Sequence, residues 1–184
     1  MKRLWLSKIF WTIAGAVLFT GSALGDGSLS DTQKKETVYA MYADYKKDFP
    51  AVTDISPQQA MALLKNDDIV FVDTRKPAEM TVSMLPHALS RNEFLDHPEK
   101  YGGKTVVGYC TISYRSGLFA REMAQKGITV RNLKGGILAW TLEGGTVYDQ
   151  NGATTKRLHV YGKKWDFAPA GYETVMFGLW EQLF

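Results

Sequence analysis

The sequence predicts an α/β fold in which a central parallel sheet of about five strands carries helices on both faces. Three observations favour this class. Segments of strand length alternate with segments of helical periodicity through the middle of the chain. Residues 69–73 form an apolar run of strand length, which is typical of a central strand covered on both sides. The β-branched residues 105–107 lead through a short loop into a helical pattern.

The first 25 residues have the composition of a secretory signal peptide. An apolar run at residues 9–19 follows three cations, and small residues lead up to Gly25. The cations are Lys2, Arg3 and Lys8. We therefore expect cleavage near Gly25 and export of the chain, into the periplasm or the medium. The alternative is an uncleaved membrane anchor, because residues 9–25 carry no charge and a membrane-spanning helix needs about 20 apolar residues. Both place the folded part outside the cytoplasm.

Residues 26–50 are predicted to form a linker and an N-terminal helix. Residues 26–32 are polar and contain glycine, which favours a linker. Five apolar residues then recur at helical spacing until Pro50 stops the pattern. They are Val38, Met41, Tyr42, Tyr45 and Phe49. We expect this stripe to pack against the following domain rather than against a membrane or a partner helix.

Residues 51–145 are predicted to form the domain proper. Ser56 is a good helix N-cap and Pro57 suits the first helical position, so a helix is expected to run from there to Asn66. The remaining elements follow from periodicity and from glycine positions. Strands are expected at residues 52–55, 69–73, 105–110 and 127–133, and helices at residues 116–126 and 137–142.

Residues 146–184 differ from the domain in being rich in aromatic residues. A final helix is expected to present Tyr172, Met176, Leu179, Trp180 and Leu183 on one side. We expect this C-terminal extension to dock on the domain and to frame the mouth of a pocket at Cys110. The alternative is a surface that binds a protein partner.

Cys110 is the only cysteine and lies between a strand and a helix. A loop that enters a helix N-terminus presents unpaired amides and the positive end of the helix dipole, which favour a thiolate. Arg115, five positions later, adds a cation whose forked donors suit an oxyanion. The sequence therefore predicts a nucleophilic sulfur exposed in a bowl of main-chain amides that a guanidinium closes. The alternative is a small buried hydrophobe at a strand end.

Four ordered motifs resemble landmarks of the rhodanese family. Residues 110–117 (CTISYRSG) resemble its active-site loop, and the other three are residues 72–75 (VDTR) with Glu79, residues 85–88 (LPHA) and residues 132–137 (NLKGGI) with Ala139 and Trp140. The resemblance covers about residues 52–145 and implies a rhodanese-like fold. His87 is a departure, because the family usually has glycine after the turn proline and often a histidine where this chain has Met84.

The resemblance implies site residues as well. Cys110 and Arg115 are expected to be catalytic, and Asp73, Arg75 and Glu79 to organise the loops. The loop residues expected to bind substrate are Thr111, Ile112, Ser113, Tyr114 and Ser116. From spacing alone, we expect Arg75 and Glu79 to form an ion pair and Asp73 to accept amide hydrogen bonds.

The function that follows is that of a sulfurtransferase. Cys110 is expected to take a sulfane sulfur from thiosulfate or a persulfide donor, to hold it as a persulfide, and to pass it to a thiol or cyanide. Similar phosphatases and arsenate reductases have five residues between cysteine and arginine, whereas this chain has four, which disfavours that alternative. A second alternative is a non-enzymatic module that binds a partner or carries sulfur within an exported assembly.

Composition and charge exclude other classes. The formal net charge is +3, and loss of the leader would remove three cations and no acid. The remaining chain then lacks the basic excess typical of nucleic-acid-binding proteins. No cofactor is predicted, and no set of His, Cys, Asp and Glu at ligand spacing predicts a metal site.

Overall fold

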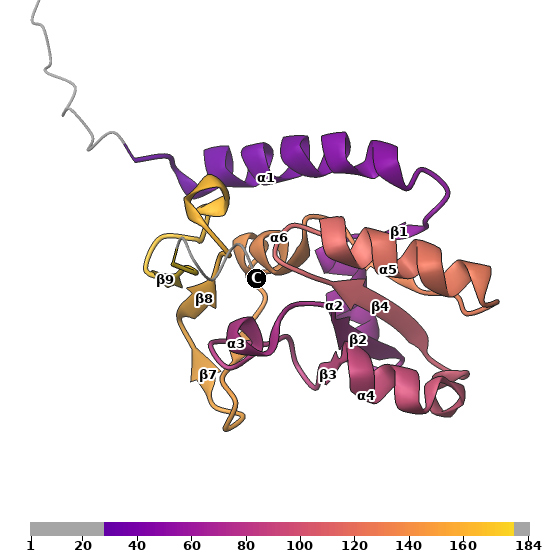
Figure 1. Cartoon of the computed structure of the whole chain (residues 1–184). Coiled ribbons are helices and arrows are strands. Elements are labelled where there is room, and N and C mark those ends of the chain that lie inside the picture. The colour runs from indigo at the N-terminus through magenta and orange to yellow at the C-terminus, as the bar shows by residue number, and fades with distance from the viewer. Residues whose placement is uncertain (1–27, 179–184) are drawn as a thin grey trace, which may run out of the picture.

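A five-stranded parallel sheet forms the centre of the structure, a computed structural model that describes residues 28–178. Its strands run in the order β1-β5-β4-β2-β3 (Figure 1). They are β1 (Asp54–Ile55), β2 (Ile69–Asp73), β3 (Leu89–Ser90), β4 (Thr105–Tyr109) and β5 (Arg131–Leu133). In the middle of the sheet Gly108 is paired with Val72 on one side and with Asn132 on the other. The predicted parallel sheet is confirmed.

Helices cover both faces of this sheet, as predicted. Their bounds are α1 (Asp31–Tyr45), α2 (Pro57–Leu64), α3 (Pro77–Met80), α4 (Arg91–Asp96), α5 (Tyr114–Gln125) and α6 (Gly136–Leu142). Single 3-10 turns are η1 (Lys46–Asp48), η2 (Pro98–Tyr101) and η3 (Lys163–Trp165). The Ser56 hydroxyl accepts a hydrogen bond from the Gln59 amide at 3.2 Å, so α2 has the predicted cap.

The alternation of side chains along the strands builds two cores. Phe71 of β2 faces the layer of α2 and α6, where it meets Trp140 edge-on, with ring centroids 5.3 Å apart. Its neighbour Val72 faces the layer of α4 and α5, together with Phe94 and Phe119. Successive side chains of a strand point to opposite faces, so a strand covered on both sides must be apolar throughout.

The N-terminal helix α1 packs on α6 (Figure 1). It begins at Asp31, inside the segment predicted as linker, because Ser30 and Gln33 form a capping box there. The predicted apolar stripe is confirmed, since Val38 and Tyr42 are buried, and Phe49 is buried just after η1. The predicted leader lies outside the described residues. None of the helices within residues 28–178 is long and apolar enough to cross a membrane.

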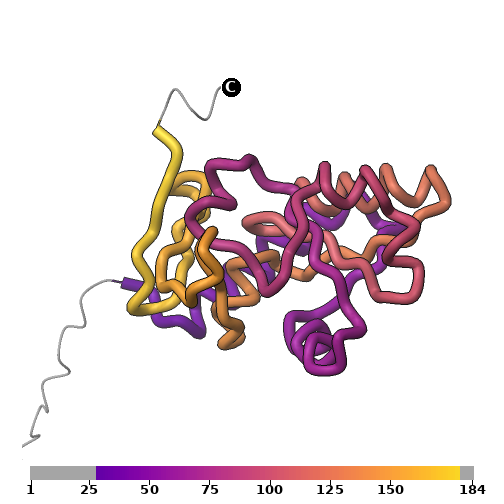
Figure 2. The backbone as a smooth tube through the Cα atoms, turned by 90° about the horizontal axis from the view of Figure 1, so that it is seen from below, coloured from indigo at the N-terminus to yellow at the C-terminus, as the bar shows by residue number. Residues whose placement is uncertain are grey.

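The C-terminal extension forms small sheets beside the main one. Strands β6 (Val147–Tyr148) and β7 (Thr154–Thr155) form a hairpin, and β8 (Arg157–His159) pairs in parallel with β9 (Glu173–Val175). Figure 2 shows this segment running alongside the start of α1. Leu158, Val160 and Ala168 lie in the core that α1 and α6 share.

The predicted final helix is wrong where the structure describes it. Tyr172 precedes β9 and Met176 follows it, and the extended backbone between them is hydrogen-bonded to β8. The β-branched residues Thr174 and Val175 suit that strand, and the pairing with β8 overrides the local helical spacing. Leu179, Trp180 and Leu183 lie outside the described residues.

Candidate active site

The loop that carries Cys110, defined here as residues 110–116 and called the Cys110 loop, joins β4 to α5. It turns at Ser113, which has a left-handed backbone (φ 73°), and α5 begins at Tyr114, two residues before the predicted start. The Ser113 hydroxyl donates a hydrogen bond to the carbonyl of Leu133. The turn is thus tied to the end of the neighbouring strand β5.

Asn132, buried in β5, holds the same loop through its side-chain amide. Its Nδ2 donates to the Ser113 carbonyl at 3.0 Å, and its Oδ1 accepts from the Ser116 hydroxyl at 2.7 Å. Nδ2 also lies 3.3 Å from the hydroxyl of Tyr42 in α1. One buried amide therefore links the loop to β5 and α1, and it fixes the strained turn that the loop needs.

The carbonyls at the start of the loop are turned toward α6. The amide of Ile137 donates to the Cys110 carbonyl at 2.9 Å, and that of Leu138 donates to the Thr111 carbonyl at 3.3 Å. The amides of residues 111–116, in contrast, donate no hydrogen bond to any other residue among 28–178. Free amides at the start of a helix are suited to binding an anion.

Cys110 itself is buried, with 2% of its surface exposed. The expectation of an exposed sulfur is therefore wrong. Its neighbours Thr111 and Ile112 are buried almost as deeply, and aromatic side chains from α1 and the C-terminal extension stand over the loop. The residues next to Cys110 do not predict these aromatic side chains over the loop, because they come from segments that are distant in the sequence.

Arg115 lies near Cys110 and pairs with a buried acid. Its Nη1 donates to Glu79 Oε2 at 2.6 Å, and its Nη2 donates to Glu79 Oε1 at 2.7 Å. Burial works to lower the pKa of Arg115, but hydrogen bonding to Glu79 and electrostatic interactions with Cys110 and Glu79 raise it above its ordinary value. The guanidinium is therefore fixed in its charged form next to the sulfur.

Glu79 also holds Thr111, whose hydroxyl donates to Oε1 at 3.2 Å. Burial tends to raise the pKa of Glu79, whereas the hydrogen bond and charge of Arg115, with Arg75 and the Lys76 amide, lower it below its ordinary value. The predicted pair between Arg75 and Glu79 is wrong. Spacing along one helix suggested it, but Glu79 reaches a partner 36 residues away.

Arg75 instead pairs with Asp73, and both side chains are fully buried. Asp73 accepts the backbone amide of Arg75 at 3.0 Å, as predicted, and the hydroxyl of Tyr109 at 2.5 Å. This network ties the ends of β2 and β4 together beneath the Cys110 loop. It supports the site through the backbone of these strands.

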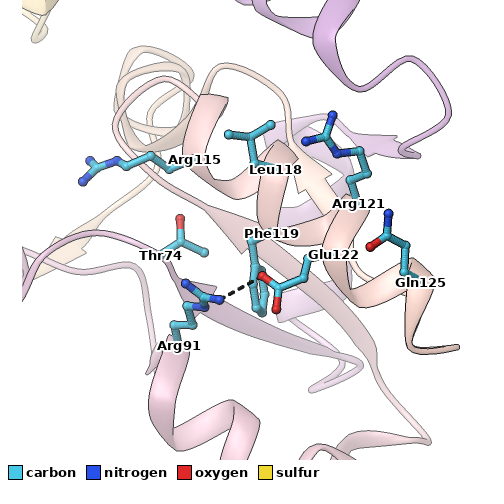
Figure 3. A pocket seen from close by; sticks show the side chains of 8 residues that line it. All are labelled: Thr74, Arg91, Arg115, Leu118, Phe119, Arg121, Glu122 and Gln125. Atoms are coloured by element: carbon cyan, nitrogen blue, oxygen red, sulfur yellow. Dashed lines mark hydrogen bonds and ion pairs between the residues drawn. The ribbon is translucent and has the colours of Figure 1, made fainter.

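Two hollows meet at Arg115. The larger, of about 480 Å³, lies along α5 (Figure 3), and an ion pair between Arg91 and Glu122 crosses it. Figure 3 shows the Arg115 side chain directed away from Arg121 and Gln125. The smaller hollow, of about 320 Å³, lies on the Cys110 loop, and we call it the aromatic pocket. Its lining is Tyr45, Thr111, Ile112, Tyr114, Arg115, Tyr161 and Trp165.

Comparison with known proteins identifies the family. Residues 56–143 match the family model described as "Rhodanese-like domain". A protein of Allochromatium vinosum named "Sulfurtransferase" is 34% identical over 93 residues, which cover 48% of this chain and 87% of that protein. The chain belongs to the rhodanese family.

Two further relatives give the extent of the similarity. An uncharacterized protein of Synechocystis is 34% identical over 95 residues, which cover 49% of this chain and 52% of that protein, so the match spans about half of its length. A crystal structure of thiosulfate sulfurtransferase from Pseudomonas aeruginosa superposes with a TM-score of 0.50 at 20% identity, over 65% of this chain and 23% of that one. At 20% identity, the similarity to the Pseudomonas aeruginosa structure shows a shared fold.

The predicted substrate-binding residues of this rhodanese-like domain fall into two groups. Thr111, Ile112 and Tyr114 line the aromatic pocket. Ser113 and Ser116 are fully buried, and their hydroxyls bond to Leu133 and Asn132 respectively. The side chains of these two serines therefore position the loop, and only their backbone amides remain to bind a substrate.

Sequence reasoning missed several residues of the site. Tyr45, Tyr161 and Trp165 line the pocket, and Asn132 holds the loop. The aromatic composition of the extension was the signal for two of them, but it did not tell which residues face the loop. His87 is exposed and lines another hollow, with Met84 and Asp149. Within residues 28–178, no three His, Cys, Asp or Glu side chains are grouped to bind a metal ion.

Proposed function

We propose that this rhodanese-family protein is a sulfurtransferase that uses a persulfide on Cys110. The thiolate attacks the outer sulfur of a donor such as thiosulfate, the sulfur–sulfur bond of the donor breaks, and sulfite leaves with the electron pair. A second nucleophile, a thiol or cyanide, then takes the outer sulfur of the persulfide and restores the Cys110 thiolate. Atoms and charge balance without an oxidant or a cofactor.

The observation that carries the proposal is the position of Cys110 between free amides and a guanidinium. The carbonyls of Cys110 and Thr111 are bonded to α6, so the loop amides remain available. They can stabilise the charge that develops on the terminal sulfur of a persulfide. Arg115, held in place by its ion pair with Glu79, lies close enough to Cys110 to interact with it electrostatically.

The same contacts disfavour the phosphatase alternative. Both terminal nitrogens of Arg115 donate to Glu79. Phosphoryl transfer needs the forked donors of an arginine for the oxygens of the transferred group. Here these donors are already paired with a carboxylate.

Mass spectrometry of the intact protein tests the proposal. Incubation with thiosulfate should add one sulfur atom to the wild-type chain, cyanide should remove it as thiocyanate, and Cys110→Ser should show no addition. If no sulfane-sulfur donor modifies Cys110, and a pull-down yields a stable partner, the protein is a binding module instead.

We further propose that the chain is exported, on the composition of residues 1–25. Expression of the full chain followed by fractionation of the cells should place the protein outside the cytoplasm with its N-terminus near residue 26. A cytoplasmic protein that keeps Met1 or Lys2 at its start contradicts the proposal.

A further inference from the structure

The aromatic pocket brings together three segments that are distant in sequence. Tyr45 comes from the end of α1, Tyr114 from the start of α5, and Tyr161 and Trp165 from the C-terminal extension. Its other walls are Thr111 and Ile112, which directly follow Cys110, and Arg115, which interacts electrostatically with Cys110. The pocket therefore lies beside the buried Cys110 and is lined by the two residues that follow it.

The aromatic walls hold one another in place. Trp165 Nε1 donates to the Tyr45 hydroxyl at 3.2 Å, and the Tyr45 and Tyr114 rings lie 5.2 Å apart. Tyr161 meets Trp165 edge-on, with centroids 5.4 Å apart. Because the indole N–H and the Tyr45 hydroxyl satisfy each other, the face that remains toward the pocket is mainly apolar carbon.

The pocket contains little free positive charge. Of the seven described residues that line it, Arg115 alone is charged, and Glu79 neutralises it through two hydrogen bonds. The guanidinium carbon lies 5.1 Å from the centroid of the Tyr161 ring, which covers it. A small inorganic dianion would lose its hydration here without gaining an unpaired cation.

We infer that the preferred sulfur donor is organic: a sulfane-sulfur anion whose outer sulfur reaches Cys110 while an apolar group fills the aromatic pocket. This inference rests on the proposed sulfurtransferase function and adds the substrate class. The volume of about 320 Å³ is sufficient for such a group, since a dry cavity of about 150 Å³ holds benzene. An aromatic ring or short alkyl chain gains free energy on burial against these walls, whereas thiosulfate has nothing to bury.

Thiosulfonate anions provide a stable probe of this preference. The Cys110 thiolate attacks the outer sulfur of R–SO₂–S⁻, the sulfur–sulfur bond breaks, and the sulfinate R–SO₂⁻ leaves with the electron pair. Methanethiosulfonate and benzenethiosulfonate share this chemistry and differ in the apolar group. Their kcat/KM values, measured by thiocyanate formation with cyanide as acceptor, therefore report on the pocket.

We expect benzenethiosulfonate to exceed methanethiosulfonate in kcat/KM by roughly 10- to 100-fold in the wild-type chain. Trp165→Ala should reduce this ratio to within about 3-fold of unity, while Trp165→Phe, which keeps an aromatic wall, should retain most of it. Tyr172→Ala is the matched control, because Tyr172 is a half-buried aromatic residue of the same extension that faces another hollow.

The outcomes separate this inference from the function on which it rests. A ratio near unity in the wild-type chain, or equal ratios in the wild-type chain and Trp165→Ala, would overturn the organic-donor inference while Cys110 still gains sulfur. Absence of any sulfur adduct on Cys110 with all three donors, thiosulfate included, would overturn the sulfurtransferase function itself.

Discussion

Arg115 and Glu79 form a forked ion pair in which two guanidinium nitrogens meet two carboxylate oxygens at 2.6 Å and 2.7 Å. The Glu79 side chain is fully buried, whereas that of Arg115 keeps 31% of its surface exposed. The pair joins α3 to the first turn of α5, so it fixes the Cys110 loop against the segment that follows β2. A buried acid of this kind is costly to leave without its partner.

The pair should make stability depend on pH through Glu79. Its pKa in the folded chain lies below the ordinary value of 4.5, so the stabilisation is complete above pH 4.5 and is lost as the pH falls through the folded pKa. Glu79→Gln lacks this contribution. Urea unfolding should show the wild-type chain more stable by about 3 kcal/mol at pH 7, with the difference shrinking as the pH falls below 4.5. A difference that stays constant or grows over this range contradicts the prediction.

Removal of Arg115 should affect chemistry and stability separately. Arg115→Ala should lower turnover with any donor by roughly 10- to 1000-fold, the range for loss of one charge-stabilising contact. It should also destabilise the fold, because it leaves Glu79 buried and unpaired. The double variant Arg115→Ala/Glu79→Gln should regain much of the stability and none of the turnover. Recovery of turnover in the double variant would show that Arg115 serves only to compensate Glu79.

Gly136 should be sensitive to the smallest substitution. Its backbone is left-handed (φ 62°), and a Cβ atom would lie 2.3 Å from the Cys110 carbonyl oxygen and 2.7 Å from that of Thr111. Gly136→Ala must therefore displace the Cys110 loop, and we expect turnover to fall at least about 100-fold. Gly144→Ala is the control, because Gly144 is also left-handed (φ 86°) but has open space around its Cβ. Equal losses in the two variants would mean that backbone strain alone matters.

The Tyr109 hydroxyl should contribute stability from beneath the site. It donates to Asp73 at 2.5 Å and accepts the Leu85 amide at 3.1 Å, and the residue is fully buried. Tyr109→Phe leaves the buried Leu85 amide unsatisfied and removes one donor from Asp73, which keeps its bonds to Arg75, so it should lower the free energy of unfolding by about 1–3 kcal/mol. Tyr101→Phe, at a half-buried ring that stacks on Phe94, is expected to cost less. Urea unfolding of both variants at one pH compares them, and an equal cost contradicts a special role for Tyr109.

The sequence predicted those parts of the fold that depend on short-range patterns. Strand β2 was predicted with its true bounds, because an apolar run between polar residues marks a central strand by itself. The cap at Ser56 likewise depends on neighbours a few residues away. The early start of α5 was missed, because the left-handed turn at Ser113 is held by Asn132, a residue of another strand.

The structure brings several of the predicted site residues near one another, but not in the predicted pairings. Arg115 lies close enough to Cys110 for an electrostatic interaction, as their spacing suggested. The partner of Glu79, however, was assigned by helical spacing to Arg75, whereas the fold brings Arg115 to it across 36 residues. The strand at residues 173–175 was missed for a related reason, because it depends on pairing with β8, which no local pattern encodes.

The hydrogen bonds between α1 and the extension have a consequence for the order in which the molecule is completed. Lys34 donates to the Ala168 carbonyl, Asp31 accepts the Ala170 amide, and Trp165 donates to Tyr45. Cys110 is synthesised some fifty residues before Tyr161 and Trp165. A nascent chain therefore contains Cys110 before these two walls of the aromatic pocket exist.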